Sequence, residues 1–173
     1  WVSAARLRTI PLSISGVLIG SFASLNENKF NLSVFLLTLL TTVSYQVLSN
    51  FANDYGDGAK GTDKNRIGPT RSIESGAISL AEMKKGIILA AIFSLFLTIL
   101  LVYISFQDDL INFVIFIALG ALAIFSAIKY TVGSTAYGYV GLGDIFVFLF
   151  FGLVSVLGSH FLFTSSFNSS LIY

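Results

Sequence analysis

Five uncharged, mostly apolar stretches alternate with short polar segments along the chain, at residues 10–25, 32–52, 86–106, 110–128 and 145–163. Four of these stretches approach or reach the roughly 20 residues that a membrane-spanning helix needs. The first stretch is shorter, so its helix would have to extend into the flanking residues. The pattern therefore predicts an all-α, polytopic bundle of about five transmembrane helices.

The composition is that of a membrane protein and not of a soluble domain. Of the 173 residues, 55% are hydrophobic and only 11% are charged, and the mean hydropathy is +0.85. Glycine and other small residues recur within the apolar stretches, as helix packing in lipid favours. The net charge of +1 gives no reason to expect a nucleic-acid partner. Because the chain has no cysteine, disulfides and cysteine-based metal sites are excluded.

The basic residues are divided unevenly between the segments that flank the apolar stretches. Nine of the ten precede the first stretch or lie in the second–third and fourth–fifth connections: Arg6, Arg8, Lys60, Lys64, Arg66, Arg71, Lys84, Lys85 and Lys129. Only Lys29 lies in one of the other connections. Cytoplasmic loops of membrane proteins carry such an excess of Lys and Arg. We therefore expect the N-terminus and both basic loops in the cytoplasm, and the C-terminus outside.

Local signals predict several helix ends and two long loops. Pro11 lies near the start of the first helix, where its missing N–H costs little. Ser79 and Glu82 form a capping-box pattern that predicts the start of the third helix. After the second helix, four glycines predict that the chain opens into a flexible polar loop: Gly56, Gly58, Gly61 and Gly68. A second polar loop spans residues 129–144. Since both loops lie on one side of the membrane, we expect an active site at the cytoplasmic face.

The most informative polar segment follows the second apolar stretch. On a helix, Asn50, Asp54 and Asp57 stand at i, i+4 and i+7 and share one face, which Gln46 extends by one turn. Hard oxygen ligands stacked in this way suit Mg²⁺ and, with it, a phosphorylated substrate. The alternative is that these acids simply end a helix in a solvated loop. Acids near a helix C-terminus oppose the helix dipole and repel one another unless a cation is present. The metal site is therefore favoured, and Asp63 is a further candidate ligand.

Basic side chains near the same face are candidate contacts for a diphosphate: Lys60, Lys64, Arg66 and Arg71. The alternative is that they only follow the charge bias of cytoplasmic loops. Arginine grips phosphate better than lysine because its guanidinium is a planar fork. Arg66 and Arg71 also flank Gly68-Pro69, a rigid turn that could aim them back at the metal.

Four other polar residues have ordinary structural explanations. Lys129 and Tyr130 could neutralise and shape the site, or they could serve as a C-terminal cation and an interfacial aromatic. Asp144 is expected to be the N-cap of the fifth helix. His160, the single histidine, lies in the other half of the fifth helix, so we expect a packed or hydrogen-bonded residue.

The segment Asn-Asp-Tyr-Gly-Asp-Gly-Ala-Lys-Gly-Thr-Asp at 53–63 resembles the first Asp-rich motif of the UbiA superfamily of intramembrane prenyltransferases. Three further stretches agree with it, at 5–13, at 66–71, and at 138–144 running into Phe150-Phe151-Gly152. Their order and spacing fit, so the resemblance covers essentially the whole chain. Within the superfamily, the chain is most similar to the 1,4-dihydroxy-2-naphthoate polyprenyltransferases of menaquinone biosynthesis.

The resemblance implies a nine-helix domain of which residues 1–173 form the N-terminal part. It implies an enzyme of the bacterial cytoplasmic (inner) membrane with a cytoplasm-facing cavity. The enzyme would use Mg²⁺ to transfer a polyprenyl group from polyprenyl diphosphate to 1,4-dihydroxy-2-naphthoate, which loses its carboxylate to give demethylmenaquinol. The metal ligands would be Asn50, Asp54, Asp57 and Asp63, with Asp54 and Asp57 catalytic. The substrate contacts would be Asn50, Lys60, Arg66, Arg71, Lys129, Tyr130 and Tyr139.

The resemblance implies a second Asp-rich motif after the fifth helix. This chain departs from that pattern, because it has no acidic residue after Asp144. We therefore expect a fragment of a longer protein that is inactive alone. The alternatives are another aromatic acceptor, such as 4-hydroxybenzoate, homogentisate or a haem, and a non-catalytic membrane protein that binds lipid or quinone. A CDP-alcohol phosphatidyltransferase is disfavoured because its Asp-Gly-x-x-Ala-Arg pattern is absent. A transporter is disfavoured because the charges lie at helix ends and not near the bilayer midplane.

Overall fold

The computed structural model describes residues 1–62, 68–167 and 171, and within these residues it contains helices and no strands. The helices are α1 (Val2–Ala5), α2 (Ile10–Ala23), α3 (Leu32–Lys60), α4 (Leu80–Phe106), α5 (Leu110–Lys129), α6 (Gly143–Val147) and α7 (Ser159–Thr164). A π-helical segment, η4 (Phe148–Gly158), joins α6 to α7. Three short 3₁₀ turns are η1 (Leu7–Thr9), η2 (Ser24–Glu27) and η3 (Tyr137–Val140). The predicted all-α fold is confirmed.

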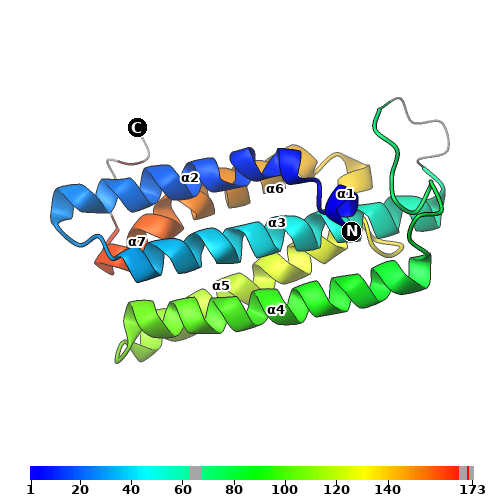
Figure 1. Ribbon diagram of the computed structural model, residues 1–173. Coiled ribbons are helices and arrows are strands. Elements are labelled where there is room, and N and C mark those ends of the chain that lie inside the picture. Colours follow the sequence, from blue (N-terminus) through cyan, green and yellow to red (C-terminus); the bar gives the residue numbers. More distant parts are fainter. Residues whose placement is uncertain (63–67, 168–170, 172–173) are drawn as a thin grey trace.

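The long helices lie side by side and form one elongated bundle (Figure 1). Five segments are long and apolar enough to cross a membrane: Val2–Glu27, Leu32–Lys60, Leu80–Phe106, Leu110–Lys129 and Gly143–Thr164. The five predicted spans are therefore confirmed, and the chain is an integral membrane protein. The short first stretch gains length from the flanking turns, as expected. The N-terminus lies toward the end of the bundle that carries the loop after α3, and α7 lies at the opposite end.

The start of α4 follows the local sequence, whereas the start of α6 does not. The capping box is confirmed, because the Glu82 N–H donates to Ser79 Oγ at 3.3 Å and the Ser79 N–H donates to Glu82 Oε2 at 2.9 Å. The N-cap prediction for Asp144 is wrong, since α6 begins at Gly143 and Leu142 is its N-cap residue. Asp144 lies instead in the first turn, where a carboxylate still faces the positive end of the helix dipole.

Helix α3 lies at the centre of the bundle and contacts α1, α2, α4, α5 and α7. On the neighbouring α2, two glycines allow a close approach to the last span. A Cβ on Gly16 would lie 2.9 Å from the Phe151 carbonyl oxygen, and a Cβ on Gly20 would overlap the Val156 carbonyl. Small residues four apart commonly bring helix backbones together in lipid. This contact joins the first span to the last.

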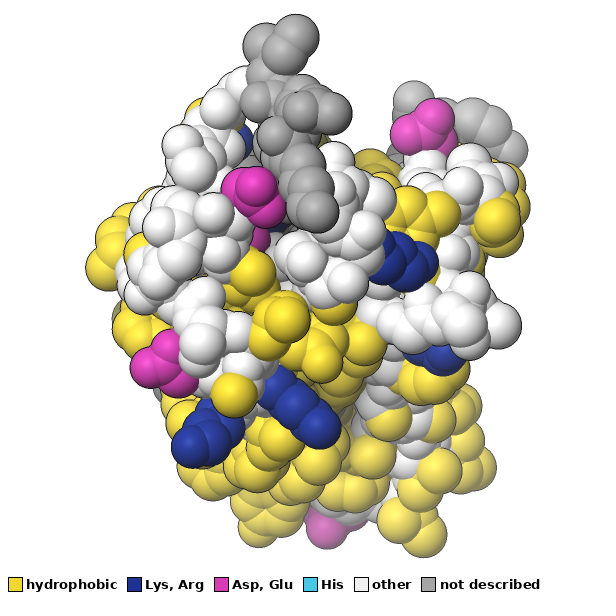
Figure 2. Space-filling model, turned by 90° about the vertical axis from the view of Figure 1, so that its right-hand side faces the viewer, with side chains coloured by type: hydrophobic (Ala, Val, Ile, Leu, Met, Phe, Trp, Pro, Cys, Tyr) yellow, Lys and Arg dark blue, Asp and Glu magenta, His cyan; other side chains and the backbone are white. Residues whose placement is uncertain are grey.

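The outer surface of the bundle is apolar along its sides. Side chains such as Ile92, Phe96, Val114 and Phe125 are more than half exposed, which suits contact with lipid tails. Charged side chains gather instead at the end that carries the loop after α3, with apolar side chains around them (Figure 2). The surface therefore divides as expected for a membrane-embedded bundle with one functional end.

The opposite end is joined by polar contacts. His160 is 1% exposed, and its Nε2 lies 3.0 Å from Glu27 Oε1 while its Nδ1 lies 3.4 Å from Thr164 Oγ1. Lys29 Nζ donates to the Thr164 carbonyl at 3.1 Å. The prediction of a packed, hydrogen-bonded His160 is confirmed. These contacts tie the turn between α2 and α3 to α7.

Candidate active site

The acidic segment lies on the last turns of α3 and not in a loop. The prediction that Gly56 and Gly58 open the chain is wrong, because the helix continues and is capped only by Gly61, at a φ of 69°. Both glycines serve close packing within the helix. A Cβ on Gly56 would lie 2.6 Å from the Thr131 carbonyl oxygen, and a Cβ on Gly58 would lie 2.6 Å from Ile73 Cγ2. The helix therefore fixes the acidic side chains rigidly on one face.

Asp54 is the most deeply buried acid of this face, with 1% of its surface exposed. Its Oδ2 accepts a hydrogen bond from the backbone N–H of Ser72 at 3.1 Å. A buried carboxylate requires such donors, because desolvation of an ionised acid is costly. The contact brings the loop after α3 back onto the helix.

Asp57 gathers side chains from both polar loops. Its Oδ2 lies 3.0 Å from Nη2 of Arg71, and its Oδ1 accepts a hydrogen bond from the Tyr139 hydroxyl at 2.6 Å. The Arg71 and Asp57 side chains are only 9% and 15% exposed. Lys60 Nζ lies 3.6 Å from the centre of the Tyr139 ring, a cation–π geometry. We call Asp57, Lys60, Arg71 and Tyr139 the Asp57 cluster.

A second feature of this end is a basic cavity of about 310 Å³. Its charged lining residues are Arg6, Arg8, Arg71 and Asp54. Three guanidinium groups around one carboxylate suit an anion that carries several oxygen atoms. Arg6 and Arg8 were predicted only as charges that set the membrane topology, although both lie in the 5–13 stretch of the superfamily resemblance.

Asn50 shares the acidic face, but in this structure its amide binds protein groups. It is 3% exposed, and its Nδ2 donates to the Ala5 carbonyl at 2.8 Å and to Thr9 Oγ1 at 3.1 Å. These two contacts flank Arg6, whose φ of 50° lies in the left-handed region. Asn50 thereby holds the N-terminal segment that carries the basic cavity.

The end of α5 contributes aromatic side chains. Lys129 closes the helix as predicted, and its Nζ donates to Thr135 Oγ1 at 2.9 Å, within its own loop. The Tyr130 ring meets the Tyr137 ring edge-on at a centroid distance of 5.4 Å. The Tyr137 hydroxyl donates to the Ser126 carbonyl at 2.7 Å. Burial, with a smaller contribution from Tyr130, raises the pKa of Tyr137 to about 12, although the side chain of Ser126 opposes the rise.

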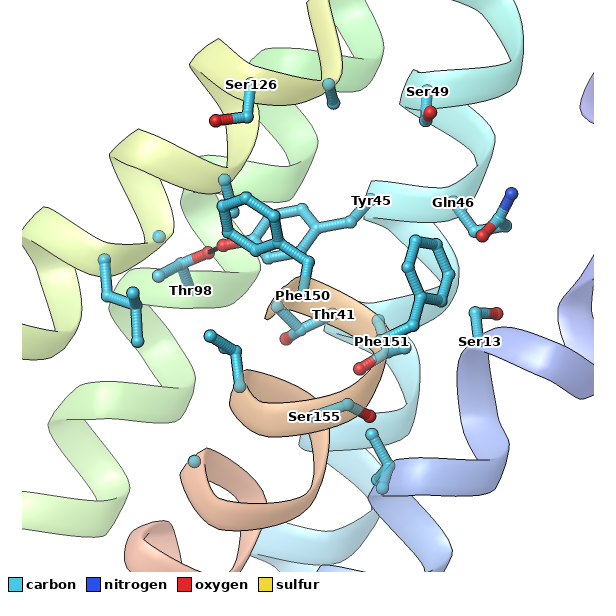
Figure 3. A pocket seen from close by; sticks show the side chains of 18 of the residues that line it. Ser13, Thr41, Tyr45, Gln46, Ser49, Thr98, Ser126, Phe150, Phe151 and Ser155 are labelled. Atoms are coloured by element: carbon cyan, nitrogen blue, oxygen red, sulfur yellow. Dashed lines mark hydrogen bonds between the residues drawn. The ribbon is translucent and has the colours of Figure 1, made fainter. Parts of the chain in front are cut away.

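An apolar cavity of about 370 Å³ runs between α2, α3, α4, α5 and the last span. Asn53, Tyr130 and Tyr137 line it near the acidic end, and Leu162 lines it near the other end. Figure 3 shows Tyr45 and Gln46 of α3 beside it, with Phe151 of the last span between Tyr45 and Ser13 of α2. The Tyr45 hydroxyl lies 2.6 Å from Thr98 Oγ1 on α4. The cavity is thus mostly apolar with a few polar groups on its walls.

The predicted metal ligands are only partly within the described residues. Asp63 lies outside them, as do Lys64 and Arg66, which were predicted to contact the diphosphate. Within residues 1–62, 68–167 and 171, no group of three or more His, Cys, Asp or Glu side chains could hold a metal ion. Asp54 and Asp57 remain as two carboxylates on one helical face. Mg²⁺ is commonly bound by one or two carboxylates together with substrate phosphates and water.

The chain is similar to several known proteins over most of its length. The chain is 47% identical to "1,4-dihydroxy-2-naphthoate octaprenyltransferase" of Haemophilus influenzae, over 99% of this chain and 56% of that protein. It is 43% identical to the protein of the same name from Escherichia coli, over 94% of this chain and 53% of the relative. A "UbiA prenyltransferase domain-containing protein 1" of Dictyostelium discoideum is 28% identical over 99% of this chain and 52% of the relative.

The chain therefore spans about half the length of the curated relatives it matches. No solved structure matches it significantly. The pattern of the UbiA prenyltransferase family matches residues 13–173, which is nearly the whole chain. The chain belongs to the UbiA prenyltransferase family.

Proposed function

We propose that this protein transfers a polyprenyl group from polyprenyl diphosphate to 1,4-dihydroxy-2-naphthoate, with loss of the carboxylate, in menaquinone biosynthesis. The observation that carries the proposal is a charged site at one end of an apolar cavity. A polyprenyl diphosphate divides in the same way, into an anionic head and an apolar tail. The names of the bacterial relatives support the naphthoate as acceptor.

The charged end would face the cytoplasm of a bacterial inner membrane. The Asp57 cluster lies at the end that carries the two basic loops. Loops rich in Lys and Arg are retained on the cytoplasmic side of the membrane. The apolar sides of the bundle would contact lipid. A prenyl diphosphate could then enter with its tail in the bilayer and its head at the aqueous face.

Asp54 and Asp57 would hold Mg²⁺, and their carboxylate oxygens fit the preference of this hard cation. Asp63 is retained as a further proposed ligand. Asn50 is a weaker candidate, because its amide binds Ala5, Thr9 and Gln46. When bound, Mg²⁺ would neutralise negative charge on the departing diphosphate.

The side chains of this site would prepare the C–O bond of the prenyl diphosphate for cleavage. Arg71 and Tyr139 orient the carboxylate of Asp57, and Arg6 and Arg8 supply positive charge for the diphosphate oxygens. Fixed positive groups of this kind stabilise the charge that develops on a leaving group. The electron pair of the C–O bond would leave with the diphosphate, and an allylic carbocation would remain at the mouth of the apolar cavity.

Aromatic faces would then surround the carbocation until the acceptor attacks. Tyr130 and Tyr137 line the cavity near the acidic end, and Tyr137 stays neutral because its pKa is about 12. Neutral aromatic rings attract cations through their faces. The acceptor ring would form the new C–C bond, and CO₂ would leave as the ring regains aromaticity.

The test uses the full-length protein in membranes with polyprenyl diphosphate, Mg²⁺ and 1,4-dihydroxy-2-naphthoate. We expect demethylmenaquinol and CO₂ by mass spectrometry, and we expect both to disappear with EDTA or in the Asp54→Asn variant. Glu74→Gln is the matched control, because Glu74 is an exposed acid in the loop after α3 and should be dispensable. If product forms only with a different aromatic acid, the proposal that 1,4-dihydroxy-2-naphthoate is the acceptor would be overturned. If no acceptor gives product, the proposed prenyl transfer would be refuted, and a lipid- or quinone-binding role would be favoured.

A further inference from the structure

Gln46 carries a buried acceptor atom that the bundle leaves unused. It lies one turn before Asn50 on α3, is 8% exposed, and donates from Nε2 to Asn50 Oδ1 at 3.3 Å. Within the part of the chain that the structure describes, its carboxamide oxygen Oε1 is buried and receives no hydrogen bond. A buried polar atom without a partner is destabilising, so native structures retain few of them, and often for a functional reason.

A chain of contacts fixes which atom of the Gln46 amide faces the cavity. The Ala5 carbonyl can only accept a hydrogen bond, so it must face Nδ2 of Asn50, as observed at 2.8 Å. Oδ1 of Asn50 therefore faces Gln46, which must present Nε2 to it. The Gln46 oxygen is consequently directed away from Asn50, and an amide flip would bring two oxygen atoms together.

The Oε1 atom of Gln46 lies beside the apolar cavity. Gln46 lines that cavity with Ser13 and Phe151, and Figure 3 shows its oxygen on their side and its nitrogen turned away from them. On the last span, the Ser155 hydroxyl lines the same cavity and is also buried without a partner among the described residues. An occupant that carries hydroxyl groups would satisfy both atoms, whereas an apolar prenyl tail would satisfy neither.

Three other polar groups of the cavity are already used by the protein. Thr98 Oγ1 donates to the Ser94 carbonyl at 2.7 Å, so the Tyr45 hydroxyl must donate to Thr98. Thr41 Oγ1 likewise donates to the Leu37 carbonyl at 2.8 Å. Among the described residues, the Gln46 oxygen thus differs from the hydroxyl groups of Thr41, Tyr45 and Thr98 in having no hydrogen-bond partner.

We propose that Gln46 determines acceptor specificity by accepting a hydrogen bond from a hydroxyl group of the aromatic acceptor. The inference rests on the proposed function. The hydroxyl keeps its proton and donates to Oε1, which orients the ring and makes its oxygen more electron-donating toward the attacking carbon. An acceptor without that hydroxyl would leave Oε1 unpaired, so we expect about 10- to 100-fold discrimination against it.

The experiment compares acceptors on the full-length protein in membranes. The values of kcat/KM are measured for 1,4-dihydroxy-2-naphthoate and for the two naphthoates that each lack one of its hydroxyl groups. Where an analogue reacts too slowly, its inhibition constant against the diol replaces kcat/KM. We expect wild type to prefer the diol over one analogue by about 10- to 100-fold, and Gln46→Leu to reduce this ratio to about 2. Gln46→Glu in its protonated form can donate from its O–H to Asn50 Oδ1 and accept with its other oxygen, so it should retain a preference for the diol.

Thr41→Val is the matched control, because it removes a cavity hydroxyl that the protein already satisfies. We expect the ratio between acceptors to stay at the wild-type value in this variant, whatever its rate. If the enzyme is active but Gln46→Leu lowers kcat/KM equally for all acceptors, the proposed role of Gln46 is overturned and the proposed function is not. A wild-type protein that prenylates no acceptor would overturn the proposed function as well.

Discussion

Replacement of Asn50 by alanine should release the N-terminal segment from α3. The side chain donates to the Ala5 carbonyl at 2.8 Å and to Thr9 Oγ1 at 3.1 Å, and it is 3% exposed. Two neutral hydrogen bonds contribute about 0.5–1 kcal/mol each, and a buried carbonyl left unpaired adds about 1–2 kcal/mol. Arg6 between them adopts a left-handed conformation that costs roughly 1–2 kcal/mol. We therefore expect Asn50→Ala to weaken docking of this segment by about 2–4 kcal/mol.

The substitution Ala4→Cys introduces a thiol that reports this docking, because the 173 residues contain no cysteine of their own. Ala4 is 1% exposed and packs against Leu48 and Ala52 of α3, so a thiol at this position would react only when the segment opens. At 1.4 kcal/mol per tenfold, Asn50→Ala should raise the rate of maleimide labelling about 30- to 700-fold. Asn53→Ala is the matched control, since Asn53 accepts a hydrogen bond from Thr131, which follows α5, and among the described residues forms no hydrogen bond with the N-terminal segment.

The same variant separates the two roles considered for Asn50. If its amide binds the metal, Asn50→Ala should raise the Mg²⁺ concentration needed for half-maximal product formation and leave the labelling at position 4 slow. If it holds the N-terminal segment, labelling should accelerate, and turnover should fall even at saturating Mg²⁺. Unchanged labelling together with a raised Mg²⁺ requirement would refute the reasoning from the Ala5 and Thr9 contacts.

Two further predictions concern packing and titration. Gly20→Ala should destabilise the full-length protein by about 1–3 kcal/mol, because its Cβ would overlap the last span. In Gly152→Ala the new Cβ would lie 3.6 Å from the nearest side chain, so thermal unfolding in detergent should distinguish the two variants, and equal shifts would contradict the packing argument. Because its folded pKa is raised to about 12, Tyr137 should stabilise the fold fully below pH 10 and lose that contribution as pH rises toward 12. Difference titration of tyrosinate absorbance against Tyr137→Phe checks this, and ionisation near pH 10 would contradict it.

The transmembrane architecture was predictable because bilayer thickness and backbone hydrogen bonding restrict the possibilities. An apolar run near 20 residues in length has few solutions in lipid other than a helix. The error at Gly56 and Gly58 has a physical cause. A glycine can loosen a helix or let another segment approach it, and only the positions of Thr131 and Ile73 decide between these roles.

The part of the site that lies on a single helix was predictable from the sequence. Helical periodicity places Asn50, Asp54 and Asp57 on one face without any tertiary information. The partners of these residues come from distant segments: Arg71 and Tyr139 for Asp57, Ala5 for Asn50. Such pairings depend on how loops fold back onto α3, which local spacing does not encode. Arg6 and Arg8 were missed for this reason, since the charge bias of cytoplasmic loops already explained them.

The polar residues of α3 follow one another in an order that matches their surroundings along the helix. Gln46 lies beside the apolar cavity, Asn50 holds the N-terminal segment, and Asp54 and Asp57 lie at the charged end. At 1.5 Å per residue, Gln46 and Asp57 are separated by about 16 Å along one rigid axis. If Gln46 orients the acceptor and Asp57 the diphosphate, this axis sets where the two substrates meet. The rigid packing of Gly56 and Gly58 would then serve the chemistry, because a flexible helix end would let that separation vary.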